Sequence, residues 1–169
     1  IGNIFNGYIQ KSINTMRPDI WQIIFDAVIT SPAAASLTNG KLRIDFGLTT
    51  SPAGDIARSV ADTLSIRAIM APGGNLQGGL VLKLQPSDYS NLSGLGQQVT
   101  EKGQFLPWLD WLLTLGQQII ITNHGVSYGS KGRTGGGNMD KREAPFKVDS
   151  QFAGTVDDNF ITRAVQSVV

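Results

Sequence analysis

The sequence predicts an α+β fold, with an antiparallel or mixed β-sheet packed against helices and a helix at the C-terminus. Apolar residues recur at spacings of three and four over the first 30 positions, which is typical of amphipathic helices. Short strand-like runs and helical patterns then interchange along the chain. A length of 169 residues suits one hydrophobic core, so we expect a single domain spanning 1–169.

Two helices are predicted in the N-terminal segment. The first carries the stripe Ile4, Phe5, Tyr8, Ile9 and Ile13. It should end near Arg17, because proline disfavours helical geometry in the residue before it. The second begins at Pro18, which suits a first helical turn, and ends at Ser31 and Pro32. Its apolar stripe is Trp21, Ile24, Phe25 and Val28.

The middle of the chain predicts strand, helix and strand in turn. Residues 41–47 alternate, with Leu42, Ile44 and Phe46 on one face and Arg43 and Asp45 on the other. Pro52, Gly54 and Asp55 begin a helix that carries Ile56, Val60, Leu64 and Ala68 and closes at Pro72 to Gly74. A second strand spans Leu80 to Leu84, and residues 87–103 form a loop with room for one helical turn.

The last third begins with an apolar helix predicted from Phe105 to Leu115. Pro107 lies in its first turn and Gly116 just past its end. Trp108 and Trp111 favour either the core or a buried subunit contact over an exposed platform.

Strands and a capped helix are predicted to complete the fold. Ile119 to Ile121 mark a central strand over 117–122, and Val126 and Tyr128 either continue it or pair back. Phe146 and Val148 suggest one more short strand. Thr155 and Asp158 resemble a capping box for the terminal helix, which carries Phe160, Ile161, Ala164, Val165 and Val168.

Charge and composition favour a protein that binds copies of itself or stable partners. Charged residues make up 16% of the chain, whereas about a quarter is usual. The net charge of +1 provides no global attraction for nucleic acid or membranes. The chain has no cysteine, which excludes disulfides and thiolate sites. No apolar run approaches the roughly 20 residues that span a bilayer. Because the chain begins with Ile1, we expect processing or a preceding segment.

A glycine-rich basic segment at 129–143 is predicted to be a flexible arm or hairpin tip. Gly129 to Gly137 has the composition of a phosphate loop, but lacks the terminal Lys-Ser/Thr that opens into a helix. Five basic residues against two acidic ones give residues 130–147 a net charge of +3. A solvated loop is the simpler interpretation, and non-specific DNA contact through Lys131, Arg133 and Lys141 is the alternative.

No catalytic, cofactor-binding or metal-ligating residue is assigned. His124 is the only histidine, so a multi-histidine metal site is excluded, and a turn position explains it better than a catalytic triad. Asp157 and Asp158 are adjacent, and adjacent helical positions do not face each other. Their acidity suits a helix N-terminus instead.

Several segments resemble proteins of tailed bacteriophages. SPAGDIARSV, residues 51–60, is similar to a helix start in tail-completion and neck proteins. PWLDWLLTLGQQIII, then GRTGGGNM and FAGTVDDNFITRAV, resemble phage virion and morphogenesis proteins over roughly the last 60 residues. The long apolar helix and the glycine arm depart from the tail-completion pattern.

This resemblance implies a non-enzymatic virion protein of the head–tail junction, assembled in the host cytoplasm as a ring around the DNA channel. The neighbours of such a subunit are copies of itself and other phage head, neck or tail proteins. Ring subunits need two different contact faces. The candidates for subunit or partner contact are Lys131, Arg133, Arg142, Phe152, Phe160, Ile161 and Arg163. The alternatives are a small virion-associated hydrolase that uses His124, or a nucleic-acid-binding module.

Overall fold

The computed structural model describes residues 2–45, 48–70, 78–87, 89, 97–99, 105–116, 120–121, 124–128, 137–141 and 146–168. Within these ranges the fold is α+β, as predicted. The strands among these described residues form four separate antiparallel pairs rather than one larger sheet. The helices are α1 (Gly2–Ile29), α2 (Pro32–Asn39), α3 (Lys41–Asp45), α4 (Ala53–Asp62), α5 (Trp108–Leu115) and α6 (Phe160–Gln166).

Strand pairing joins β1 (Leu64–Met70) to β2 (Gly78–Leu84), and β3 (Gln97–Val99) to β4 (Phe105–Pro107). It also joins β5 (Ile120–Ile121) to β8 (Phe146–Lys147), and β6 (His124–Tyr128) to β7 (Gly137–Lys141). The strand predicted over 117–122 is present at Ile120–Ile121 as β5, but within the described residues it pairs with β8 alone, so its predicted central position is wrong there. Residues 126–128 pair with β7 and do not continue β5.

Helix α1 is continuous through Pro18, so the predicted break at Arg17 is wrong. An interior proline removes one helical hydrogen bond and costs about 3 kcal/mol. Packing on both sides of Pro18 offsets this cost. Ile13 and Ile24 are both buried and lie on one face of the helix. The Arg17 guanidinium donates to the Leu64 carbonyl oxygen at 3.1 Å, and Trp21 Nε1 donates to Asp62 at 2.8 Å.

Residues 41–45 form helix α3, so the strand predicted there is wrong. Asp45 is 1% exposed and Ile44 is 37% exposed, the reverse of the predicted alternation. Asp45 forms an i,i+4 ion pair with Lys41, which a strand could not provide. The Arg43 guanidinium donates to backbone carbonyl oxygens of Thr38, Leu48 and Thr49. A five-residue alternation cannot outweigh these contacts.

The helix predicted to begin at Pro52 and to close at Pro72 to Gly74 ends well before those residues. Helix α4 stops at Asp62, where Thr63 donates from both its amide and its hydroxyl to the Val60 carbonyl oxygen. The chain then becomes strand β1, and Leu64 pairs with Leu84. Leu64 and Ala68 lie at helical spacing, but the partner strand β2 imposes an extended conformation on them.

The C-terminal elements agree with the predictions in part. Helix α5 begins at Trp108, because Phe105 to Pro107 pair with β3, a strand within the predicted 87–103 loop. Gly116 follows the helix with φ 61°, as a C-terminal glycine does. The N-cap of α6 is Asn159 rather than the predicted Thr155. Thr155 and Asp158 instead close a turn before it, since the Asp158 amide donates to Thr155 Oγ1.

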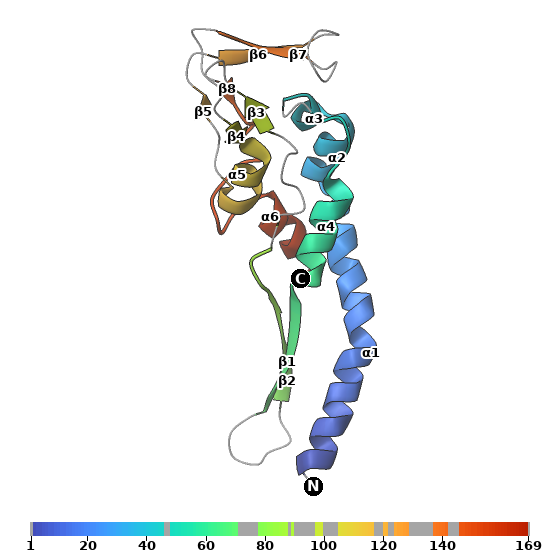
Figure 1. The fold of residues 1–169 in the computed structure, drawn as a ribbon. Coiled ribbons are helices and arrows are strands. Elements are labelled where there is room, and N and C mark those ends of the chain that lie inside the picture. The colour runs from blue at the N-terminus through green and yellow to red at the C-terminus, as the bar shows by residue number, and fades with distance from the viewer. Residues whose placement is uncertain are drawn as a thin grey trace.

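One hydrophobic cluster joins both ends of the chain. Val28, Leu37, Leu42, Val60, Leu112, Val148 and Phe160 are among its buried members. Figure 1 shows that α1 is the longest element and that the β1–β2 hairpin lies alongside its N-terminal half, beyond the body formed by the other helices. The fold therefore combines a compact body with a helix and a hairpin that extend from it.

Candidate functional site

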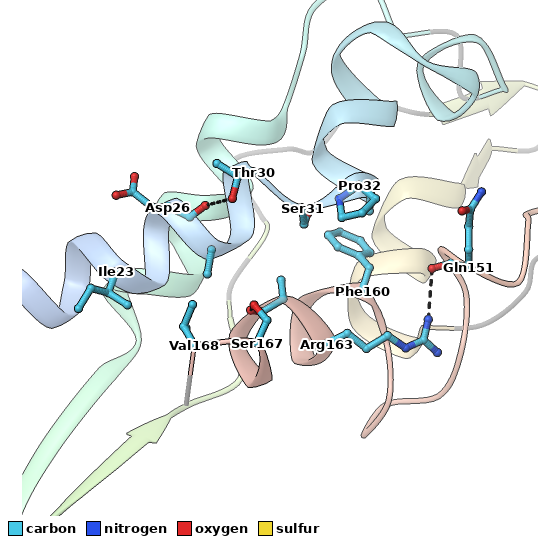
Figure 2. Close-up of a pocket in the computed structure, with 13 residues that line it drawn as sticks. Ile23, Asp26, Thr30, Ser31, Pro32, Gln151, Phe160, Arg163, Ser167 and Val168 are labelled. Carbon is cyan, nitrogen blue, oxygen red and sulfur yellow. Dashed lines mark hydrogen bonds between the residues drawn. The ribbon is translucent and has the colours of Figure 1, made fainter.

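A groove of about 590 Å³ lies between the C-terminal part of α1, the start of α2 and helix α6. We call it the α1–α6 groove. Figure 2 shows the Phe160 ring beside Pro32, with Ile23 and Val168 at one end and Gln151 and Arg163 at the other. Its lining consists of Ile23, Asp26, Ala27, Thr30, Ser31, Pro32, Ala33, Gln151, Phe160, Arg163, Ala164, Ser167 and Val168.

Two helix caps hold the walls of this groove. Ser31 is the N-cap of α2, and its hydroxyl accepts a hydrogen bond from the Ala34 amide at 3.2 Å. Asn159 caps α6 by accepting from the Ile161 and Thr162 amides, and its side-chain amide donates to the carbonyl oxygens of Thr155 and Val156. Both caps are buried, so they fix where the two helices begin.

Two charged residues, Asp26 and Arg163, line the groove, and the guanidinium of Arg163 is held by its neighbours. Arg163 Nε donates to Asp158 Oδ1 at 2.7 Å, Nη2 donates to Oδ2 at 3.2 Å, and Nη1 donates to the Gln151 carbonyl oxygen at 3.2 Å. The hydrogen bond from Arg163 holds the pKa of Asp158 below its usual value. The groove thus has an apolar floor and a rim whose cation is already paired. It is suited to binding an apolar surface.

The β1–β2 hairpin presents a second unusual surface. Ile69, Leu80, Val81 and Leu82 are between 40% and 54% exposed. Residues directly opposed in an antiparallel pair share a face. Leu82 therefore shares a face with Leu64, Ile66 and Leu84, and only the last three of these pack on the core. The outer face carries Arg67, Ile69, Val81 and Lys83. We call these last four residues the outer-face patch.

The predicted contact residues are not brought together. Phe152 and Phe160 are buried in the core of the chain, and Phe160 also lines the groove, so their role in subunit contact stays a prediction. Ile161 is partly buried against the same core, and Arg163 lies on the groove rim. Lys141 is exposed at the end of β7. Lys131, Arg133 and Arg142 lie outside the described residues.

Other predicted residues have structural surroundings. His124 begins β6 opposite Lys141. Asp157 is exposed in the turn before α6. Trp111 packs on the core, and the prediction about the Trp108 side chain lies outside the described residues. Tyr89 is buried, and this burial, opposed by a weaker hydrogen bond with Ser87, raises its pKa to about 12. Its phenol is therefore protonated at neutral pH.

Sequence reasoning missed both the groove and the hairpin. No local sequence pattern at Ile23 or Asp26 indicates a groove, because the groove depends on how α6 packs against α1. The hairpin did leave a signal. Gly73, Gly74, Gly78 and Gly79 separate two apolar runs of similar length, which is a pattern typical of a β-hairpin.

Two further properties of the described residues bear on ligand classes. No three His, Cys, Asp or Glu side chains within them come together as a metal site would require. No single helix among them is long and apolar enough to cross a membrane; residues 7–29 and 32–39 pass that test only as a pair bent by 59°. No family model, curated protein or solved structure matches this chain.

Proposed function

We propose that this chain is a non-enzymatic structural subunit of a tailed-phage virion at the head–tail junction, as a neck, connector or tail-completion protein. In this role it forms an oligomeric ring around the DNA channel. The phage-like segments over its last 60 or so residues and the low charge of 16% support the proposal. So does its elongated shape, in which a long helix and a hairpin extend from the body (Figure 1).

The exposed β1–β2 hairpin is the single observation that carries the proposal. A two-stranded hairpin is marginally stable in water by itself. This one leaves four large apolar side chains largely uncovered, two on each of its faces. Such surfaces mark contact sites in soluble proteins. A subunit that is complete only within an assembly accounts for both features.

The test is the mass of the purified protein by light scattering, with negative-stain images of the same fraction and a repeat at high salt. We expect a closed ring, or a monomer that becomes a ring when other virion proteins are added. A monodisperse monomer that remains unchanged in the presence of those proteins would contradict the proposal.

In this ring, the basic segment that follows β6 in the sequence and the exposed Lys141 are proposed to face the DNA in the channel. We expect the triple change Lys131→Gln, Arg133→Gln and Lys141→Gln to lower the slope of log affinity against log salt by about 2 to 3. Filter binding over a salt series measures this slope. The matched control is Lys11→Gln on α1. Equal slopes for the triple variant and the wild type would show that these cations do not contact DNA.

A further inference from the structure

We propose that the outer-face patch of the β1–β2 hairpin docks on α1 of a second copy of this chain, at the mouth of its α1–α6 groove. The receiving surface consists of Asp19, Ile23 and Asp26, which we call the acidic edge. This inference rests on the proposed oligomeric function and names the surfaces that make the contact.

The two surfaces match in composition. Each combines exposed apolar side chains with two charges of one sign: Arg67 and Lys83 on the hairpin, and Asp19 and Asp26 on α1. Ile23, between the two carboxylates, is 51% exposed. Residues 64–70 and 78–85 contain no acidic residue. Neither Arg67 nor Lys83 forms an ion pair within the described part of the chain, and Asp19 and Asp26 do not either.

The charges also match in spacing. Arg67 lies opposite Val81, and Lys83 is two residues further along β2, so the two cations are diagonal neighbours. Diagonal neighbours in an antiparallel pair are about 8 Å apart. Asp19 and Asp26 are seven residues apart on a helix, which places them on one face about 10 Å apart. Long lysine and arginine side chains readily span this difference.

The contact has to be intermolecular. The hairpin begins where Arg17 contacts the Leu64 carbonyl oxygen. Arg17 and Asp26 are nine residues apart, about two and a half helical turns, so they lie on opposite sides of α1. The hairpin of a chain therefore lies on the far side of α1 from its own acidic edge. Two different surfaces on opposite sides of a subunit make a head-to-tail contact, which is the kind that closes a ring.

Charge reversal tests this pairing. One variant carries Asp19→Lys and Asp26→Lys, and the other carries Arg67→Glu and Lys83→Glu. All four positions are exposed, so both variants are expected to fold, which circular dichroism and thermal unfolding verify. In an assembly of either variant alone, the outer-face patch and the acidic edge would carry charges of the same sign at every contact. We expect the self-association of each variant to weaken by about a hundredfold. The control, Arg58→Glu on α4, lies in neither surface and should assemble as the wild type does.

Mixing the two variants provides the decisive measurement. In an alternating assembly, one contact pairs native charges and the next pairs reversed charges of opposite sign, so light scattering should show that the mixture associates although each variant alone does not. Two results would overturn this docking and leave the proposed function standing. One is that both charge-reversal variants assemble as the wild type does, and the other is that the mixture of the two variants stays dissociated. A wild-type chain that never self-associates would also overturn the docking, because the proposed docking partner is a second copy of the chain. In that case, assembly with other virion proteins tests the proposed function by itself.

Discussion

At the residue scale, Gly116 is a position where the backbone requires glycine. Its φ of 61° lies in the left-handed region, and a Cβ there would meet the Thr155 carbonyl oxygen. We expect Gly116→Ala to lower the free energy of unfolding by about 1–2 kcal/mol from backbone strain, with the close contact adding to this loss. Urea denaturation measures the change.

Gly7 provides the matched control for this substitution. It lies within α1, and a Cβ at this position meets no atom within 4 Å. Gly7→Ala is therefore expected to raise the free energy of unfolding by about 0.5–1 kcal/mol. A Gly116→Ala variant as stable as the wild type, or more stable, would contradict the assignment of Gly116 to a left-handed C-terminal position.

The Asp158–Arg163 pair predicts a pH dependence at the same scale. Because the hydrogen bond from Arg163 lowers the pKa of Asp158 in the folded state, the stabilising contribution is present above the unfolded carboxyl pKa of about 3.9 and disappears as the pH falls through the lower folded value. Asp158→Asn should therefore lose less stability than the wild type on acidification. Thermal unfolding at neutral and acidic pH measures this difference.

Salt and a neighbouring carboxylate control for this effect. Both partners are exposed, so added salt should shrink the difference between the wild type and Asp158→Asn. Asp157→Asn removes the adjacent charge, which has no ion pair within the described residues, and should leave the acid dependence close to that of the wild type. An unchanged acid dependence in Asp158→Asn would contradict the pairing.

At the element scale, α1 contains a proline that destabilises the helix and can be replaced. Pro18 lies exposed within a continuous helix, where proline costs about 3 kcal/mol. We expect Pro18→Ala to raise the free energy of unfolding by about 1–3 kcal/mol. Chemical denaturation checks this. Pro86→Ala, in the segment after β2 and outside any helix, is the control and should be neutral or slightly destabilising. A destabilised Pro18→Ala would indicate two helices instead of one.

Elements that carry their own signals were predictable. Ile56 and Val60 with the start signals before them indicated α4, Leu80 to Leu84 indicated β2, and Gly116 marked the end of α5. Elements that depend on distant partners were not. Leu64 to Met70 became a strand through pairing with β2. Residues 41–45 were mispredicted for a different reason, because their helix is held by contacts of Lys41 and Arg43 with residues no more than six positions away, which a short apolar alternation does not display. The terminal cap shifted to Asn159 because its side chain satisfies more backbone groups than Thr155 does.

At the scale of the whole molecule, the core is shared by helices from both ends of the chain. Leu112 on α5 is fully buried in this cluster, whereas Leu115, one turn later, is 40% exposed. Leu112→Ala should therefore cost about 2–5 kcal/mol of stability, because a buried cavity is left behind. Leu115→Ala should cost no more than about 0.5 kcal/mol. Equal losses in urea denaturation would contradict the orientation of α5.

By itself the sequence determined the α+β class, the low charge, the exclusion of cysteine chemistry and the apolar stripes of α1, α4 and α5, since these follow from composition and local spacing. It also predicted a basic glycine-rich arm or hairpin tip over 129–143, although residues 137–141 of that range form strand β7. Only the tertiary structure decided that α1 continues through Pro18, that Phe160 is core, and that the outer-face patch and the acidic edge lie on opposite sides of α1. The physical reason is that burial and strand pairing join residues far apart in the chain, and their free energies outweigh the local preferences that a sequence displays.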